Sequence, residues 1–168
     1  MNEKKLIKKA IRGDGDSFAL LIQEKNDMLY RIAFSYTKNQ QNALDVVQDT
    51  IMKAFTSLKT LKQEEYFYTW LTRILINTAK NSIKKEYKYL PLDVEPQNNF
   101  PAINEDYLDL YMALERLEDS ERELIQLKFF EDMTFSEISN VLDISENTIK
   151  SRYYKILPKL EKFLQEDA

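Results

Sequence analysis

The chain has 168 residues, with two Gly, four Pro, no Cys, no His and a formal net charge of −4. The absence of Cys and His excludes disulfides, zinc fingers and catalytic sites built on either residue, and two glycines are too few for the phosphate loop of a P-loop or Rossmann enzyme. No apolar run is long enough to span a bilayer, and the lysine-rich N-terminus lacks the apolar core of a signal peptide. We therefore expect a soluble, cytoplasmic chain without cofactor or metal.

The negative total conceals an uneven distribution of charge. Residues 1–90 carry a net +6, residues 91–112 carry −5 and residues 113–168 carry −5. Within the last segment the basic residues gather after Asn147. Salt screens charges beyond about 8–10 Å, so local clusters govern contact with phosphates. The pattern fits a nucleic-acid partner, and on charge alone it also fits a solvated helix face.

The low Gly and Pro content favours helices, and four are predicted before the main cluster of prolines. The first ends at Gly13-Asp14-Gly15, where a turn is favourable. The others run from about Asp16 to Lys38, Gln41 to Leu58 and Phe67 to Lys88. In the third helix, apolar residues at helical spacing predict a core face formed by Leu44, Val47, Ile51, Ala54, Phe55 and Leu58.

Three of the four prolines lie between residues 91 and 101, in a polar and acidic stretch. Proline removes a backbone donor and keeps its predecessor out of the helical conformation, so this stretch is predicted to be extended. We expect an all-α protein with two small helical domains, residues 1–88 and 106–168, joined by a flexible linker over residues 89–105.

The second domain begins with one apolar stripe, formed by Tyr107, Leu110, Leu114 and Leu117. Two segments then have the form of a capping box, in which a hydroxyl and a carboxylate satisfy backbone donors at a helix start: Ser120-Glu-Arg-Glu123 and Thr134-Phe-Ser-Glu137. The predicted order is helix, helix, short helix, turn and long basic helix.

Asp143-Ile144-Ser145 separates the last two helices by the length of a helix-turn-helix turn, with Ser145 as N-cap. Ser139 supplies the small side chain that a close helix crossing requires, and Asp143 tolerates a left-handed conformation. Pro158 predicts a bend or an early end of the last helix.

The last helix has two different faces. Its core stripe is formed by Ile149, Tyr153, Ile156 and Leu160. The opposite face mixes side chains that bind phosphates with side chains that recognise bases: Asn147, Lys150, Ser151, Tyr154 and Lys155. A helical hairpin with a basic tail is the alternative interpretation.

These elements resemble those of extracytoplasmic-function sigma factors, the compact alternative subunits of bacterial RNA polymerase. In the second domain the resemblance rests on Leu117–Ile125, Phe129–Ile138 and Ile144–Arg152. It implies recognition of the minus-thirty-five promoter element by Ser145, Asn147, Thr148, Lys150, Ser151, Arg152, Tyr154 and Lys155.

The segment Ala43–Phe55 resembles the family helix that docks on the coiled-coil clamp of the largest polymerase subunit. The resemblance implies that polymerase is bound by Leu44, Asp45, Gln48, Asp49 and Met52. Helical spacing places four of these residues on one face of the helix: Asp45, Gln48, Asp49 and Met52. The alternative interpretation is a polar face that is only solvated.

The segment Phe67–Asn81 resembles the family's promoter-melting helix, and the polar loop before it corresponds to the specificity loop that holds a flipped minus-ten base. The residues implied in recognition and melting are Lys62, Gln63, Glu64, Glu65, Tyr66, Phe67, Arg73, Asn77, Lys80 and Lys84. Trp70 is interpreted as a core residue. Many relatives have Asp in place of Asn81 and Gly in place of Asp143.

The resemblance implies an alternative sigma factor, not an enzyme, that acts in an envelope stress response with core RNA polymerase and promoter DNA as partners. It also implies an anti-sigma factor, which is often membrane-anchored. A free-standing helix-turn-helix regulator, whose first domain senses a ligand or dimerises, is the second hypothesis. An enzyme is the third, although no convergent catalytic set is visible in the sequence.

Overall fold

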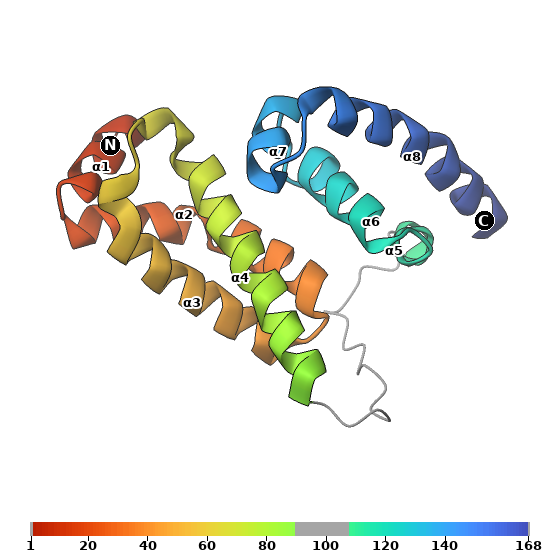
Figure 1. Ribbon diagram of the computed structural model, residues 1–168, viewed down its shortest axis with the longest axis horizontal. Coiled ribbons are helices and arrows are strands. Elements are labelled where there is room, and N and C mark those ends of the chain that lie inside the picture. The colour runs from red at the N-terminus through yellow and green to blue at the C-terminus, as the bar shows by residue number, and fades with distance from the viewer. Residues whose placement is uncertain (1, 90–107, 168) are drawn as a thin grey trace. The chain divides into compact units, whose positions relative to one another are not determined.

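The computed structural model describes residues 2–89 and 108–167 (Figure 1). The chain divides into two compact units, Met1–Asn99 and Phe100–Ala168, each described here by itself. Every regular element among the described residues is helical, which confirms the predicted all-α class. The expected linker lies outside the described residues except at Tyr89, the last residue of helix α4. No helix in the two described ranges is long and apolar enough to cross a membrane.

Residues 2–89 of the N-terminal unit form four α-helices and two short 3₁₀ helices. In chain order these are α1 (Glu3–Ile11), α2 (Gly15–Thr37), α3 (Gln40–Ser57), η1 (Leu58–Thr60), η2 (Glu64–Tyr66) and α4 (Phe67–Tyr89). Helix α2 packs against α1, α3 and α4, and its buried Leu21, Leu29 and Ile32 lie at the centre of the core. All four predicted α-helices are present.

Local chemistry explains where these helices begin and end. The side chains of Asn2 and Asn39 accept hydrogen bonds from the backbone N–H groups of Lys4 (3.1 Å) and Asn42 (2.9 Å), which caps α1 and α3. Gly13 has a φ of 101°, a value at which an L side chain would be strained, so the predicted turn after α1 forms there. Lys38 ends α2 in the left-handed conformation without being glycine.

The predicted core face of α3 is wrong in part. Leu44 is 41% exposed and Phe55 is 50% exposed. The buried side of the helix is instead formed by Ala43, Val46, Val47, Thr50 and Ala54. Both sets follow helical spacing. The second set consists of smaller side chains, which suit a helix that packs against both α2 and α4.

The C-terminal unit contains α5 (Leu108–Glu115), α6 (Asp119–Ile125), the π-helical turn η4 (Gln126–Phe130), α7 (Phe135–Leu142) and α8 (Glu146–Asp167). Leu114 and Leu117 of the predicted stripe are buried, and Leu110 is half-buried. Tyr107 lies outside the described residues. Helix α8 packs against α5, α6 and α7 and so joins the unit together.

The two predicted capping boxes have different outcomes. At α7 the box is confirmed, because the Thr134 N–H donates to the Glu137 carboxylate (2.7 Å) and the Glu137 N–H donates to the Thr134 hydroxyl (3.1 Å). At α6 the prediction is wrong by two residues: the helix begins at Asp119, and the Glu118 N–H donates to Glu121 (3.0 Å). Several acidic residues of this segment could form a capping box. The end of α5 determines where α6 begins, and therefore which of them does so.

Arg122 marks that end. Its guanidinium donates to the backbone carbonyls of Leu114 (3.0 Å), Glu115 (3.2 Å) and Leu117 (2.9 Å). Leu114 and Glu115 lie in the last turn of α5 and Leu117 lies in the turn that follows, so one side chain from α6 bonds three carbonyls at this junction. This arginine fixes the turn between α5 and α6.

Pro158 neither ends nor shortens α8, which continues to Asp167. Proline costs a helix one hydrogen bond, and side-chain contacts beyond it hold the second half of α8 in place. Lys159 donates to Glu121 (2.7 Å), Arg116 forms an ion pair with Glu166 (2.6 Å), and the Arg116 guanidinium lies 4.0 Å from the centre of the Phe163 ring. The predicted early end is therefore wrong.

Candidate functional site

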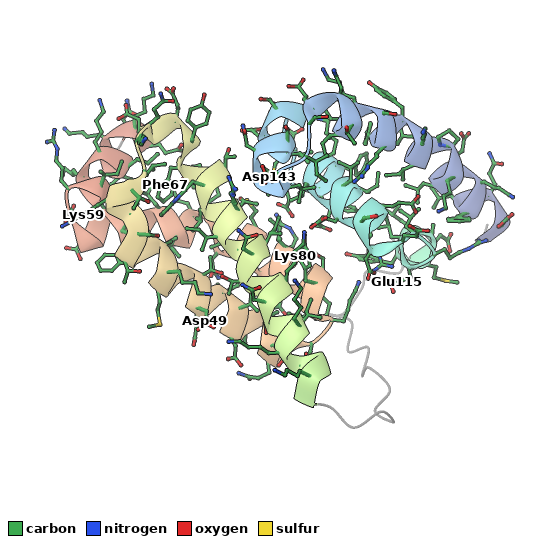
Figure 2. All side chains as sticks on the ribbon, viewed as in Figure 1. Asp49, Lys59, Phe67, Lys80, Glu115 and Asp143 are labelled. Atoms are coloured by element: carbon green, nitrogen blue, oxygen red, sulfur yellow. The ribbon has the colours of Figure 1, made fainter. Side chains whose placement is uncertain are left out.

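Helices α7 and α8 form the predicted helix-turn-helix. Asp143 adopts the left-handed conformation (φ 57°, ψ 44°) at the turn. The Ser139 hydroxyl donates to the carbonyl oxygen of Ile144 (2.6 Å), and Ser145 accepts from the backbone N–H of Thr148 (3.3 Å). The turn is therefore fixed by one left-handed residue, Asp143, labelled in Figure 2, and by two serine hydroxyls.

The structure brings the residues expected to bind the minus-thirty-five element onto the outer surface of α8. Ile149 and Ile156 are buried and Tyr153 is half-buried, so the predicted core stripe faces inward. Lys150 and Thr148 are half-buried, and the remaining residues of the set are exposed: Ser145, Asn147, Ser151, Arg152, Tyr154 and Lys155. Lys150 forms an ion pair with Glu146 one turn earlier (2.7 Å).

Sequence reasoning missed an aromatic cluster beside this surface. Phe135, at the start of α7, lies 5.4 Å from the Tyr153 ring and 6.3 Å from the Tyr154 ring, measured between centroids. Tyr154 itself is 63% exposed. The signal was present in the sequence, because Phe135 follows the Thr134 cap and therefore stands at the first position of the helix.

All five residues expected to bind polymerase are exposed on α3: Leu44, Asp45, Gln48, Asp49 and Met52. The surface is more apolar than the sequence suggested, because Met52 is 68% exposed and the exposed Phe55 lies one turn from Met52, on the same face of the helix as Leu44. Phe55 was predicted to lie in the core. Its ring packs 5.3 Å, between centroids, from the ring of Phe18 on α2.

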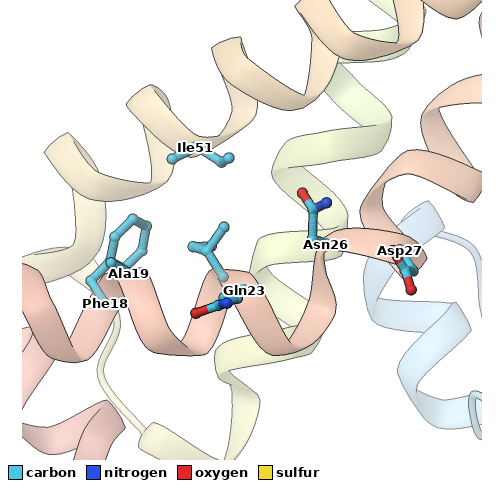
Figure 3. Close-up of a pocket in the computed structure, with 7 residues that line it drawn as sticks. Phe18, Ala19, Gln23, Asn26, Asp27 and Ile51 are labelled. Carbon is cyan, nitrogen blue, oxygen red and sulfur yellow. The ribbon is translucent and has the colours of Figure 1, made fainter.

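An open pocket of about 440 Å³ continues this surface between α2 and α3. In Figure 3 the side chains of Phe18 and Ile51 point into the space between the two helices. The pocket is further lined by Ala19, Ile22, Gln23, Asn26 and Asp27. The surface of α3 thus combines carboxylates with an apolar groove, a composition suited to a partner helix that is both basic and apolar.

In the loop before α4, Lys62, Gln63, Glu65 and Tyr66 are exposed. Glu64 is half-buried and forms an ion pair with Lys8 of α1 (3.3 Å). Phe67 is completely buried, so its expected role in recognising DNA is replaced by a role in the core. Tyr66, which is 48% exposed, is the aromatic residue that this loop presents to solvent.

Helix α4 presents the expected melting residues along one face. Arg73, Asn77, Lys80 and Lys84 are exposed and follow each other at four, three and four residues. Figure 2 labels Lys80 on this helix. Lys80 also lies 5.9 Å from the centre of the Tyr36 ring. Trp70, interpreted from the sequence as a core residue, is only half-buried, with its ring 6.1 Å from that of the buried Phe67.

Next to this segment, the hydroxyl of Tyr68 is buried and has no hydrogen-bond partner among the described residues. Burial raises the pKa of Tyr68 to about 12, and the carboxylates of Glu3 and Glu24 contribute. The Lys25 ammonium lies 4.7 Å from the centre of the ring. Within the described ranges no group of three or more carboxylates is arranged to hold a metal ion.

Comparison with known proteins identifies both units. Residues 21–89 match the family model of Sigma-70 region 2, and residues 113–162 match that of Sigma-70, region 4. The chain is 37% identical over 139 residues to RNA polymerase sigma factor SigV of Bacillus subtilis, covering 81% of this chain and 84% of SigV. It is 27% identical to ECF RNA polymerase sigma factor SigW of the same species, covering 97% of each chain.

The fold is also similar to a solved structure, the sigma factor RpoE of Bartonella quintana in complex with the anti-sigma factor NepR. The TM-score is 0.73 at 23% identity, covering 90% of this chain and 98% of RpoE. Two region matches in the expected order, and an identity of 37% to SigV, agree with the resemblance seen in the sequence. The chain therefore belongs to the extracytoplasmic-function sigma factors, the alternative sigma factors of bacterial RNA polymerase.

Proposed function

We propose that this sigma factor binds core RNA polymerase through α3 and directs it to promoters with two separate recognition surfaces. The observation that carries the proposal is the division of surface chemistry. Helix α3 presents carboxylates and apolar side chains, whereas α4 and α8 present basic and amide side chains. A protein surface and two DNA surfaces are thus separated on different helices.

The polymerase surface comprises Leu44, Asp45, Gln48, Asp49 and Met52, extended by Phe55 and the groove toward α2. Exposed apolar side chains on a helix, next to carboxylates, favour a helical partner with a basic rim. Gln41 donates to Asp45 (3.1 Å), which holds one of these carboxylates in place.

Promoter melting is assigned to the loop Lys62–Tyr66 and to α4. Opening a duplex costs a few kcal/mol per unstacked base, which a base pocket and cationic contacts to the backbone offset. Tyr66 is placed to stack on an unpaired base, and Arg73, Asn77, Lys80 and Lys84 follow the strand along α4. The exposed face of α8, from Ser145 to Lys155, is assigned to the minus-thirty-five element.

An anti-sigma factor, membrane-anchored as in other members of the family, is proposed as the partner that keeps this protein inactive in the cytoplasm until an envelope stress releases it. The fold similarity to RpoE in its complex with NepR supports the anti-sigma partner. The membrane anchor and the envelope signal rest on the family resemblance alone.

The experiment is a pull-down of core polymerase by the full chain, followed by initiation from a promoter that it selects. Asp49→Ala is expected to weaken polymerase binding by about tenfold, because a charge at a partly desolvated interface is worth about 1–3 kcal/mol. Asp16→Ala removes an equally exposed carboxylate from α2 and is the matched control. Stable promoter binding without polymerase contact, unaffected by Asp49→Ala, would indicate a free-standing regulator instead.

A further inference from the structure

The exposed residues of helix α1 are basic except for Glu3 in its first turn. Lys4, Lys8 and Arg12 follow each other at four-residue spacing, with Lys5 and Lys9 beside them, and all five side chains are exposed. The opposite side of the helix buries Leu6, Ile7 and Ala10 in the core of the unit. A helix rises 1.5 Å per residue, so these cations form a band about 12 Å long.

Most of these cations have no partner among residues 2–89 and 108–167. Lys8 forms an ion pair with Glu64 (3.3 Å), and its side chain remains 57% exposed. Lys4, Lys5, Lys9 and Arg12 form no ion pair with any described residue. Asp14 follows the helix, but its carboxylate accepts a hydrogen bond from the Ser17 hydroxyl. Unpaired cations on one rigid face produce a local positive field that favours an anionic partner.

The side of α1 that packs against the core excludes one class of partner. A helix that binds a membrane surface inserts its apolar face between the lipids, and here that face is already buried against the rest of the unit. The cationic face alone remains available. It therefore suits a polyanion with regularly spaced charges, such as a nucleic-acid backbone.

The contacts of α1 with the neighbouring loop favour promoter DNA as the nucleic acid that its basic face binds. The helix contacts η1, which precedes the loop proposed to hold the minus-ten base, and η2, which forms the second half of that loop. The Lys8–Glu64 ion pair joins it directly to that loop. Lys59 of η1, labelled in Figure 2, and Lys62 of the loop are both exposed and add two cations to this part of the unit.

We propose that the outer face of α1, with Lys59 and Lys62, binds the phosphodiester backbone of the promoter strand whose base the specificity loop holds. This proposal rests on the proposed function of that loop. It goes beyond the family match, because the region 2 match begins at residue 21 and leaves α1 outside. Binding here is to phosphates and adds affinity without sequence preference.

The test measures promoter binding by holoenzyme, assembled from core polymerase and the full chain, as a function of salt concentration. Each phosphate contact contributes about 0.7–0.9 to the slope of log affinity against log salt. Lys5→Gln combined with Lys9→Gln is therefore expected to lower the slope by about 1.5 and the affinity at low salt by about tenfold. The preference among minus-ten sequences is expected to stay unchanged.

Lys53→Gln is the control, because it removes an exposed cation from α3, a different helix of the same unit. It is expected to leave the slope unchanged. Trp70, the only tryptophan of the chain, lies in this unit, so its fluorescence checks that both variants fold.

Three results would overturn the proposal. In the first, the double variant assembles with polymerase and retains the wild-type salt slope. In the second, it loses affinity for core polymerase itself, which would make α1 a protein-binding surface. In the third, the wild-type chain without polymerase binds phosphatidylserine vesicles and the double variant does not, while the salt slope of promoter binding is the same for both. Failure of the wild-type chain to form holoenzyme would instead count against the proposed function.

Discussion

Ser139 on α7 and Ile144 in the following turn are joined by a hydrogen bond of 2.6 Å from the serine hydroxyl to the isoleucine carbonyl. The small size of Ser139 had predicted a close crossing of α7 and α8. The structure adds a second role, because the hydroxyl satisfies a carbonyl that the turn leaves without a helical partner.

Replacing Ser139 by Ala separates these two roles. Alanine keeps the side chain small and removes the hydrogen bond, so we expect a loss of about 1 kcal/mol of stability in the C-terminal unit. Ser136→Ala, at an exposed position of the same helix, is expected to change stability by less than about 0.5 kcal/mol. Urea unfolding followed by circular dichroism measures both. Equal effects of the two substitutions would show that the Ser139 hydroxyl contributes nothing to the turn.

Asp143 holds the left-handed conformation at the helix-turn-helix turn. Glycine adopts this conformation without steric cost, although it also gains entropy in the unfolded chain, so Asp143→Gly is expected to stabilise the unit by about 0.5 kcal/mol. Asp143→Val, with a branched Cβ, is expected to destabilise it by about 1–2 kcal/mol. The transition reported by Trp70 fluorescence, which belongs to the other unit, should not move. Stabilisation by valine would contradict the observed backbone geometry.

Tyr68 predicts a dependence of stability on alkaline pH. Its pKa in the folded chain is raised to about 12, mainly by burial, so the folded state holds the phenolic proton more tightly than the unfolded state. The resulting stability is complete below about pH 10 and is lost as the pH rises toward 12. Tyr68→Phe removes this loss. It also removes a buried hydroxyl without a partner, so at neutral pH we expect stability to stay equal or rise by about 1 kcal/mol.

Denaturation followed by Trp70 fluorescence at about pH 8 and pH 11 measures both effects. Tyr66→Phe is the control, because Tyr66 is 48% exposed and its hydroxyl is hydrated in both states. A clear loss of stability for Tyr68→Phe at neutral pH would mean that the Tyr68 hydroxyl has a partner in solution.

The ion pair between Lys150 and Glu146 restrains a residue of the surface assigned to the minus-thirty-five element. Glu146→Gln releases the ammonium group and removes a negative charge near the phosphates. Because an exposed pair of this kind is worth about 0.2–1 kcal/mol, promoter affinity of the holoenzyme is expected to rise by about two- to fivefold. Glu161→Gln, farther along α8, should have no effect. A decrease for Glu146→Gln would show that the pair positions Lys150 for binding.

The fold followed from the sequence where one local rule decided the outcome. Gly13 fixed the first turn, Thr134 and Glu137 closed a capping box, and the apolar stripe through Ile149 and Ile156 oriented α8. The prediction of the buried face failed in α3, where two sets of residues fit the helical period equally well. In α3 the stripes containing Leu44 and Ala43 have the same period, and only packing against two other helices selects the smaller one.

Long-range contacts account for the remaining differences. Periodicity cannot show that Lys159 and Arg116 hold α8 together beyond Pro158, or that Lys8 meets Glu64, because each contact joins residues far apart in the chain. The exposure of most candidate DNA residues along α4 and α8 could be predicted from the sequence, because an exposed helical face is a local property. Phe67 could not, since its burial depends on neighbours from other helices.

The most direct test of the central claim is initiation by core polymerase on a pool of random promoter fragments, with and without this protein, followed by sequencing of the transcript starts. We expect starts that require the protein and share two upstream elements, near minus ten and minus thirty-five. Starts that do not depend on the protein, or specific duplex binding by the protein without polymerase, would contradict its role as a promoter-specificity subunit.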